Sequence, residues 1–426
     1  MKILTVVLIG AGSRGIIYTD LMAEMKDRYK VVAVADPIEA RRNYVRDRHG
    51  LADNRCFRDW KDLLRLGKIA DVALICTMDR QHFQPVVTAI GLHYDILLEK
   101  PVSSDPRECM QIAELAEQEK VKIVVCHVLR YAPFFMTIKD LIDQGRLGRI
   151  VSVNHEECVG NVHQSHSFVR GNWGNSRRSS CMLLQKSCHD LDILQWLIGS
   201  RCRKIQSFGF LSQFQEGQAP EGAPEYCIDG CPEGENCPYN AVKLYLDDKK
   251  NRWFRDTCTQ KVDPTDEEVI EALRTTQYGK CVYRCDNDVV DHQTVNILFD
   301  GETTVTFTMC AFTKGGRSIH IMGTKGELNG SMDSEAPISL YSFETGKTEY
   351  IPFTGKDGIQ NGHGGGDRNI LLNLYELLAN GRKSKSISDI ITSVYNHLMV
   401  FAAEKSRQDG NVVDFDQYLE TLRKQK

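Results

Sequence analysis

A lysine ends an apolar stretch of the sequence and stands between a glutamate and a proline. Glu99, Lys100 and Pro101 directly follow the run YDILL at residues 94–98. A lysine that closes a buried strand loses hydration, so it either extends to water or is held in place for chemistry. If the strand belongs to a parallel sheet, Lys100 lies at the carboxyl edge, where ligands bind. We therefore predict that Lys100 transfers a proton, with a surface lysine as the alternative.

The segment KSCHDLD, residues 186–192, supplies a second group for proton transfer. His189 is the candidate, because a neutral imidazole is a general base near physiological pH and a helix N-terminus helps to keep it neutral. Lys186 and Asp192 lie close enough in sequence to take part in the same transfer. The alternative is that His189 is a buried histidine with a structural role only.

A glycine-rich motif follows the first apolar run and begins a helical segment. Such glycines permit a tight turn and let a pyrophosphate approach the amides at the helix N-terminus. The second apolar run ends at Asp36, whose carboxylate suits the ribose hydroxyls and repels a 2′-phosphate. The motif predicts NAD as cofactor, although Arg14 and Arg41 leave NADP open, and a turn that only packs helix on strand is the alternative. The predicted cofactor contacts here are Gly10, Gly12, Ser13, Arg14, Gly15 and Asp36.

The order of apolar and amphipathic segments predicts the elements that position these residues. Strand-like runs at residues 3–9, 31–36, 71–77, 94–100 and 122–126 alternate with helical segments, which is typical of a doubly wound parallel sheet. A helix over 135–144 then precedes longer alternating strands, and helices return near 369–378 and 388–407. We predict an α/β chain with an N-terminal Rossmann sheet and a C-terminal α+β domain that contains an open, mostly antiparallel sheet.

Composition argues against several classes of partner. The chain has 53 basic and 57 acidic residues without a long basic run, so we predict no nucleic-acid binding. No apolar run reaches the roughly 18 residues that a membrane span needs. The opening residues lack a signal-peptide cleavage site and run directly into the glycine motif. We predict a cytoplasmic protein that does not bind membranes, with its 15 cysteines present as thiols or metal ligands.

Three cysteines cluster in the segment YCIDGCPEGENCPY, residues 226–239. They are Cys227, Cys231 and Cys237, and Cys258 follows. Thiolates at such spacing bind zinc or, less commonly, an iron–sulfur cluster, and they stabilise loops that lack a core of their own. The spacing differs from the usual C-x2-C pair, so cysteines packed without metal are an equal alternative. Both interpretations predict a structural role in an insertion at about residues 220–260.

Two polar segments predict recognition of a sugar or polyol. Residues 161–180 are rich in hydrogen-bonding and aromatic side chains, and residues 361–367 place a histidine at a turn before a helix. Polyol recognition combines several hydrogen-bond donors with an aromatic surface, whereas a mobile surface loop is the alternative. The predicted substrate contacts are Lys100, His166, Arg170, Asn172, Trp173, His189 and His363.

The order of several short motifs resembles the Gfo/Idh/MocA oxidoreductases, the family of glucose-fructose oxidoreductase and inositol dehydrogenase. The motifs are DVALICTMDRQHFQPVVTAI (71–90), the Glu99-Lys100-Pro101 turn, VLRYAPFFMTIKDLIDQGRLGRI (128–150) and KSCHDLDILQWLIG (186–199). The resemblance implies an NAD-binding domain over 1–127 and a substrate and oligomerisation domain over 128–426. It also implies that Lys100 reaches the substrate hydroxyl beside the nicotinamide. The further cofactor contacts that it implies are Thr77, His82, Glu99, Lys100 and Arg130.

One position departs from the pattern of this family. Relatives carry an aspartate four residues before the histidine, whereas this chain has Gln185. An amide cannot take a proton or balance an imidazolium, so the usual Lys-Asp-His arrangement is incomplete. Lys186 is a candidate for part of its work.

Together these features predict an NAD-dependent oxidoreductase that acts on a sugar or polyol by hydride transfer at a ring carbinol and forms a homo-oligomer. The same fold and cofactor would serve a glycosidase that oxidises its substrate transiently, eliminates the aglycone, adds water and returns the hydride. A nucleotide-sensing regulator without catalytic activity is a third alternative. The presence of Lys100 and His189 argues against it.

Overall fold

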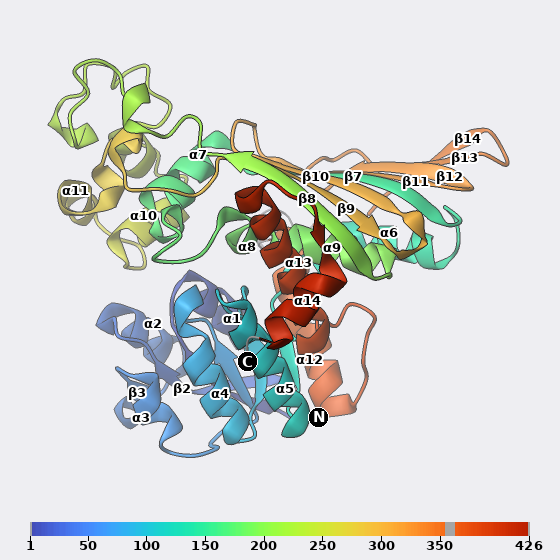
Figure 1. The fold of residues 1–426 in the computed structure, drawn as a ribbon. Helices are drawn as coiled ribbons and strands as arrows, with labels where there is room; N and C mark the ends of the chain where they lie inside the picture. The colour runs from blue at the N-terminus through green and yellow to red at the C-terminus, as the bar shows by residue number, and fades with distance from the viewer. Residues whose placement is uncertain (1, 354–362, 425–426) are drawn as a thin grey trace.

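The computed structural model describes residues 2–353 and 363–424, and it contains two β-sheets with helices between and around them (Figure 1). The first sheet has the strand order β3-β2-β1-β4-β5-β6, and all its strands are parallel. Helices cover both faces, which explains why its central strands are apolar throughout. Its strands are β1 (Leu4–Ile9), β2 (Tyr29–Ala35), β3 (Cys56–Phe57), β4 (Val72–Ile75), β5 (Asp95–Leu98) and β6 (Ile123–Val125).

Local signals in the sequence explain where the helices of this part begin and end. At α5, the Asp105 side chain accepts the amide of Arg107 and Pro106 occupies the first helical position. At the end of α2, Gly50 adopts the left-handed conformation that glycine favours. The helices of this part are α1 (Ser13–Glu24), α2 (Glu39–His49), α3 (Trp60–Leu64), α4 (Phe83–Gly91) and α5 (Pro106–Gln118).

The second sheet has the order β14-β13-β12-β11-β7-β10-β9-β8-β15. Only the pair β7 and β10 is parallel among its described strands; the others are antiparallel. Buried and exposed residues alternate along it, as one covered face requires. Its strands are β7 (Ile150–Cys158), β8 (Cys202–Phe210), β9 (His292–Phe299), β10 (Thr304–Cys310), β11 (Gly316–Gly323), β12 (Gly326–Ser331), β13 (Ile338–Ser342), β14 (Lys347–Ile351) and β15 (Val413–Asp414). The predicted fold class is confirmed.

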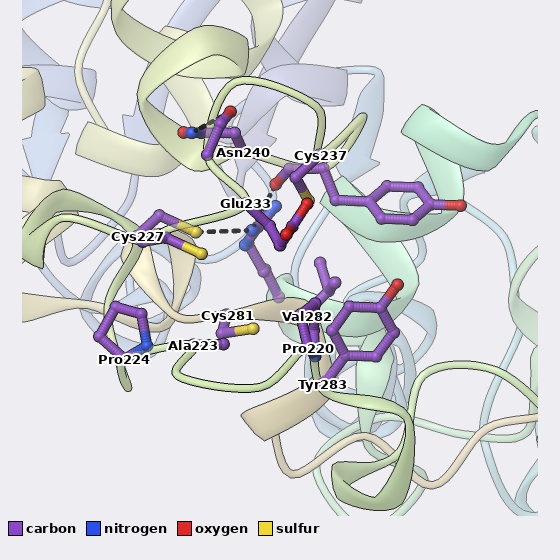
Figure 2. A pocket seen from close by; sticks show the side chains of 14 residues that line it. Pro220, Ala223, Pro224, Cys227, Glu233, Cys237, Asn240, Cys281, Val282 and Tyr283 are labelled. Carbon is purple, nitrogen blue, oxygen red and sulfur yellow. Dashed lines mark hydrogen bonds between the residues drawn. The ribbon is translucent and has the colours of Figure 1, made fainter.

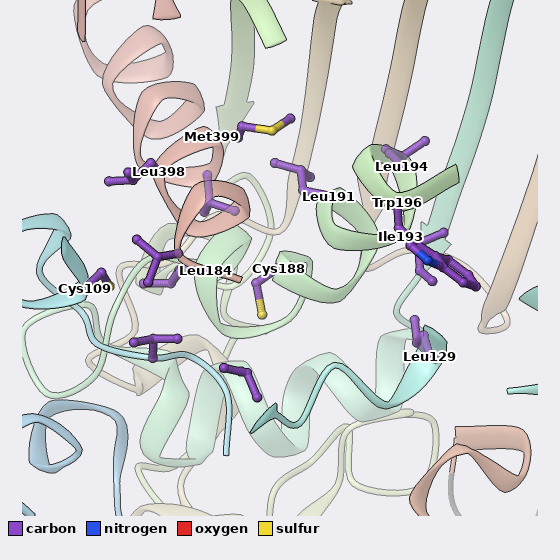
Figure 3. Close-up of a cluster of buried hydrophobic side chains, with 14 of the residues drawn as sticks. Cys109, Leu129, Leu184, Cys188, Leu191, Ile193, Leu194, Trp196, Leu398 and Met399 are labelled. Carbon is purple, nitrogen blue, oxygen red and sulfur yellow. The ribbon is translucent and has the colours of Figure 1, made fainter. Parts of the chain in front are cut away.

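Helices between the two sheets form a core that both sheets share. Figure 3 shows apolar side chains of α8 and α9 near those of α13, with Cys109 of α5 at the edge of the same cluster. Because one continuous core joins both sheets, their positions relative to each other are fixed. The helices after β6 are α6 (Pro133–Asp143), α7 (Asn161–His163), α8 (Met182–Gln185), α9 (Cys188–Ile198), α10 (Arg252–Thr259), α11 (Asp266–Thr275), α12 (Gly366–Asn380), α13 (Ile390–Asp409) and α14 (Phe415–Lys424).

Helix α12 comes late in the chain but packs on the first sheet. Ile370 and Leu374 belong to the apolar cluster formed by β1 and α1. The hydroxyl of Tyr29, on β2, donates to the carbonyl of Leu371 at 2.6 Å. The N-terminus of α12, with Asp367, therefore lies next to the glycine-rich turn.

Residues 211–291, between β8 and β9, form the insertion, which extends beyond the predicted 220–260. It has small apolar clusters of its own, around Tyr245 and Phe254 and around Phe214 and Tyr239. In Figure 1 its helices α10 and α11 lie beyond the end of the second sheet, above α2. No helix in the described residues is long and apolar enough to span a membrane.

Candidate active site

Lys100 lies just beyond the carboxyl end of β5, and its side chain reaches the segment that contains the second predicted site. Its Nζ donates a hydrogen bond to the backbone carbonyl of Gln185, the last residue of α8, at 2.6 Å. The Lys100–Pro101 peptide is cis. Two histidines hold this turn: Nδ1 of His82 lies 2.7 Å from the Pro101 carbonyl, and the Val102 amide donates to Nε2 of His397 at 3.0 Å.

The glycine-rich turn has the geometry that a dinucleotide requires. Gly10 has φ +92°, and a Cβ there would lie 2.5 Å from the Cys76 carbonyl oxygen. A Cβ on Gly15 would lie 2.2 Å from the Gly10 oxygen, whereas a Cβ on Gly12 would meet nothing within 4 Å. The first and third glycines thus allow close packing, and the second leaves room for a pyrophosphate. The residues present fit NAD.

Asp36 stands where the ribose-binding carboxylate was predicted, directly after β2. It is buried, and its two oxygens accept the amides of Ala11 at 2.7 Å and Ile38 at 2.8 Å. These bonds fix the carboxylate beside the glycine-rich turn. The carboxylate is therefore held at the carboxyl end of β2 next to the dinucleotide turn.

Arg14 pairs with buried carboxylates and not with an open phosphate site. Its Nε donates to Glu99 at 2.8 Å and its Nη2 to Asp367 at 2.6 Å. Burial alone would raise the pKa of Glu99, but the charges of Arg14 and Lys100 hold this pKa below its usual value. This network ties the glycine-rich turn, the lysine turn and α12 together. It accounts for Arg14, one of the two arginines that left NADP open.

Thr77 and His82 shape the turn after β4. Nε2 of His82 lies 2.9 Å from the Thr77 carbonyl, so both ring nitrogens of this buried histidine meet backbone carbonyls. The Thr77 hydroxyl donates to the Gln81 carbonyl at 3.2 Å. His82 therefore positions the loops at the sheet edge.

Arg130 and Asp192 form a buried ion pair with each other. The Nε and Nη2 atoms of Arg130 each donate to one Asp192 oxygen at 2.7 Å, and Asn396 donates to Asp192 at 2.5 Å. The guanidinium also lies over the Trp196 ring, 5.7 Å from its centroid. This pair fixes α9, the helix that carries His189, and the cofactor contact of Arg130 and the proton transfer by Asp192 stay predictions.

Histidines surround His189 in the crevice. Its ring centroid lies 5.7 Å from those of His127 and His363, and His127 lies 5.4 Å from His397. Burial, and then the charge of Lys100, lowers the pKa of His189 well below its ordinary value. Its Nδ1 has no hydrogen-bond partner among the described residues. A neutral, unpartnered ring is therefore available to a ligand.

Lys186 enters a network of buried charges that the sequence analysis missed. Its Nζ lies 3.4 Å from Glu157, which also pairs with Arg317. Arg317 contacts Asp190 at 2.9 Å, and His155 contacts the same Asp190 oxygen at 2.9 Å. The sequence contained a sign of this network. His155 and Glu157 occupy the same alternating, buried positions of β7 as Val153. Charged residues at inward positions of a strand indicate a site or a buried network.

The predicted substrate residues of segment 161–180 divide into two groups. His166 and Arg170 face the core of the insertion: His166 stacks on Phe254 at 4.0 Å, and Arg170 donates to the carbonyls of Lys280 and Tyr239. Trp173 is half-buried and packs near Phe168, with ring centroids 6.2 Å apart. The residue Asn172 is exposed. These contacts give His166 and Arg170 a packing role in the insertion, and contact with substrate stays a prediction for the residues of this segment.

His363 lies near His189, and its contact with substrate stays a prediction. Residues 361 and 362 of its segment lie outside the described residues. The Nδ1 atom of His363 lies 3.3 Å from Asp367. Burial lowers the pKa of His363, although Asp367 opposes the shift. His163, which the sequence analysis passed over, also belongs here: burial and then Lys186 lower its pKa well below the usual value.

The cysteines of the insertion gather around Arg170. Cys227, Cys231, Cys237 and Cys281 line one pocket, whose arrangement Figure 2 shows, and Nη2 of Arg170 lies 3.6 Å from the Cys227 sulfur. Within residues 2–353 and 363–424, no group of three or more His, Cys, Asp or Glu is arranged to hold a metal ion. The structure therefore does not support the predicted zinc site, and the cationic Arg170 lines the same pocket as the cysteines.

Comparison with known proteins agrees with the two-sheet fold described above. Residues 4–127 match the model described as oxidoreductase family, NAD-binding Rossmann fold, and residues 139–415 match its C-terminal alpha/beta domain. YteT of Bacillus subtilis (strain 168) is 24% identical over 331 residues, 74% of each chain. Inositol 2-dehydrogenase of Corynebacterium glutamicum (strain ATCC 13032) is 24% identical over 206 residues, 48% of this chain and 57% of its own length.

Solved structures share the fold at low sequence identity. An oxidoreductase from Agrobacterium radiobacter in complex with NAD+, L-tartaric acid and magnesium gives a TM-score of 0.70 at 14% identity, covering 98% of this chain and 99% of that one. Scyllo-inositol dehydrogenase from Lactobacillus casei, with bound NAD(H) and scyllo-inositol, gives 0.67 at 14% identity, covering 97% and 100%. Since the two family models together span most of the sequence, this chain belongs to the Gfo/Idh/MocA family of oxidoreductases, with an NAD-binding Rossmann domain.

Proposed function

We propose that this enzyme oxidises a sugar or polyol by transferring hydride from a ring carbinol carbon to NAD. The observation that carries the proposal is the position of Lys100. Its ammonium group lies at the carboxyl edge of the parallel sheet and is held by the Gln185 carbonyl at 2.6 Å. Ligands of such sheets bind at this edge.

Each residue of the site has a separate task in the proposed reaction. Bound NAD supplies the hydride acceptor. The amine form of Lys100 takes the hydroxyl proton as the carbinol C–H bond breaks, and the products are a carbonyl compound and NADH. His189, kept neutral by burial, accepts a hydrogen bond from a neighbouring hydroxyl or exchanges the proton with Lys100. The cofactor contacts proposed here are Gly10, Gly12, Ser13, Gly15 and Asp36.

Relatives support the substrate class. Curated relatives include inositol 2-dehydrogenases, and one structural neighbour holds scyllo-inositol with NAD(H). The described crevice has polar, nitrogen-rich groups suited to several hydroxyls, namely Lys100, Lys186, His163, His189 and His363.

A second candidate is cleavage of a glycoside with no net oxidation. A relative 24% identical over 185 residues, from Escherichia coli (strain K12), is named 2,7-anhydro-N-acetylneuraminate hydratase, which describes addition of water. In this route, oxidation of a ring hydroxyl acidifies the adjacent C–H, elimination expels the aglycone, water adds, and the hydride returns. In either route Lys100 starts from a hydrogen bond to the backbone carbonyl of Gln185, whose side chain donates to the Ser180 carbonyl.

Two readouts on one preparation separate the candidates. The protein with NAD is incubated with inositols, free sugars and aryl glycosides, while nicotinamide absorbance and released aglycone are both followed. The first proposal predicts NADH in step with oxidised sugar. Repeated glycoside turnover without NADH would favour the second, and activity on none of these substrates would contradict both.

We also propose a cytoplasmic homo-oligomer in which residues 1–127 bind the cofactor and 128–426 bind substrate and partner subunits. The second sheet supports this, since no described helix covers its outer face, where Phe208 is 51% and Phe210 63% exposed. Exposed apolar side chains grouped on one face are typical of subunit contacts. Light scattering on the full chain tests it: the mass of a single chain would contradict the proposal.

A further inference from the structure

The turn that carries Lys100 depends on side chains for its position. Within the described part of the chain, residues 100–104 take part in no backbone–backbone hydrogen bond. The Val102 amide instead donates to Nε2 of His397, on α13, at 3.0 Å. Val102 is buried, so an amide without this acceptor would be left unpaired away from water, which is costly. The imidazole of His397 therefore holds the turn two residues beyond Lys100.

The second nitrogen of His397 fixes which form of the ring is present. Nδ1 lies 2.7 Å from the Ser393 carbonyl, an oxygen that can only accept, so Nδ1 carries the proton and Nε2 is free to accept from Val102. Burial, and then the charge of His127, lowers the pKa of His397 to about 3. The ring therefore stays neutral at physiological pH, as an acceptor must.

Helix α13 gives this histidine a rigid base. Directly before the helix, the Ser388 carbonyl accepts the amide of Val125, the last residue of β6, at 2.9 Å. The neighbours of His397 in sequence, Leu398 and Met399, pack in the core that both sheets share (Figure 3). A side chain on such an element transmits a fixed position to the turn that it binds.

The same ring reaches the second candidate for proton transfer through one neighbour. His397 packs edge-to-face against His127, with centroids 5.4 Å apart, and His127 packs edge-to-face against His189 at 5.7 Å. Neither ring nitrogen of His127 has a hydrogen-bond partner among the described residues, so its ring contacts set its position. His397 thus supports both Lys100 and His189 from behind.

We propose that His397 is a positioning residue for the proton transfer, because as an acceptor on α13 it fixes the turn that keeps Lys100 at the Gln185 carbonyl. It acts through the turn and not on the substrate. This role rests on the proposed function, in which Lys100 takes the hydroxyl proton. No local motif reveals it, since Val102 and His397 are 295 residues apart.

Two amide variants separate positioning from a general loss of stability. In His397→Gln the side-chain oxygen can take the place of Nε2, whereas the shorter side chain of His397→Asn cannot reach the Val102 amide. Trace acetylation of the NAD-loaded protein with acetic anhydride, read by peptide mass spectrometry, measures the freedom of the Lys100 amine without any substrate. We expect roughly threefold faster acetylation of Lys100 in His397→Asn and the wild-type rate in His397→Gln. Ser406→Ala is the matched control, because it removes from the same helix the acceptor of another amide, that of Ser207 at 2.9 Å.

Kinetics with a sugar that the wild type oxidises complete the test. His397→Asn should lower kcat roughly tenfold, with KM and the Kd for NAD near wild type, and Ser406→Ala should not. Unchanged acetylation of Lys100 or unchanged kcat in His397→Asn would overturn the role, as would a His397→Gln variant that behaves like His397→Asn.

A measurement on the wild type covers the case in which His397→Asn does not fold. ¹⁵N NMR of the histidine rings, with the His397 signal identified by its absence in His397→Gln, should show the tautomer protonated at Nδ1. A proton on Nε2 would overturn the role. A wild type that oxidises no sugar would refute the proposed function alone, since acetylation and the tautomer are measured without substrate.

Discussion

The cofactor half and the substrate half of the crevice are built in different ways. In the cofactor half, the glycine-rich turn, Asp36 and the Glu99–Lys100 turn each follow a strand of the same parallel sheet, so short local motifs place them at one edge. In the substrate half, Glu157, Lys186 and Arg317 come from β7, the end of α8 and β11. Local backbone rules specify the first half, whereas the long-range register of an antiparallel sheet specifies the second.

This difference explains what the sequence could predict. Gly10 and Gly15 are required by clashes with the adjacent backbone, so the turn was predictable from spacing alone. The pairing of Arg317 with Glu157 depends on the β11–β7 register, which no local motif encodes. The phase of the strands was nevertheless informative, because charged residues occupy inward positions.

The insertion contains packing that short sequence motifs did not predict. The spacing of Cys227, Cys231 and Cys237 suggested a metal site, but the described residues contain no metal-binding group, and Arg170, from a π-helical segment before the insertion, lines the same pocket. His166 and Arg170 were assigned to substrate because they are polar. Both are buried among Tyr245, Phe254 and the cysteines, a packing that composition does not reveal, and their contact with substrate stays a prediction.

Removing the lysine of the cofactor half should have the largest effect. Lys100→Ala is expected to lower kcat by roughly 10²–10⁴-fold, because a positioned acid–base group is lost, while NAD binding stays near wild type. Steady-state kinetics and an NAD titration on the same preparation measure both. Lys61→Ala, on an exposed face of α3, is the control. Wild-type turnover in Lys100→Ala would remove the lysine from the mechanism.

Breaking the charge network of the substrate half should affect stability as well as activity. Arg317→Met leaves the buried carboxylates of Glu157 and Asp190 without their shared cation, which typically costs about 3–5 kcal/mol. Urea unfolding measures the loss. Arg317→Lys keeps a positive charge and should recover part of the stability. An Arg317→Met variant as stable as wild type would show that Lys186 and His155 balance the carboxylates without it.

Lowering the pH should reduce the free energy of unfolding through the buried histidines before the carboxylates become protonated. Burial lowers the pKa of His127 to about 4 and that of His397 to about 3. The unfolded chain therefore takes up protons near pH 6.5 that the folded chain refuses, and stability falls as pH drops below that value. Each histidine contributes up to about 1.4 kcal/mol per pH unit.

Urea unfolding at constant ionic strength checks this effect. The free energy of unfolding should be lower at about pH 5 than at about pH 7 by at least about 2 kcal/mol. A flat profile over that interval would mean that the histidines are protonated in the folded state, and that His189 is not held neutral.

The smallest expected effect concerns cofactor choice. Asp36→Asn removes the negative charge that disfavours a 2′-phosphate but keeps a hydrogen-bonding side chain, so the preference for NAD over NADP should fall by about tenfold. Titrations of both nucleotides measure the ratio, with the exposed residue change Asp62→Asn as control. Equal binding of NAD and NADP by the wild type would remove Asp36 from this role.

The central claim is that hydride leaves a ring carbinol carbon of the substrate and reaches the nicotinamide. Mass spectrometry of the nucleotide after incubation of the enzyme and NAD with a ring-deuterated substrate tests it most directly. The account predicts one deuterium per reduced nicotinamide, in step with the oxidised sugar, and its near-complete loss in Lys100→Ala. Oxidised sugar formed with no deuterium in the nucleotide would contradict the account.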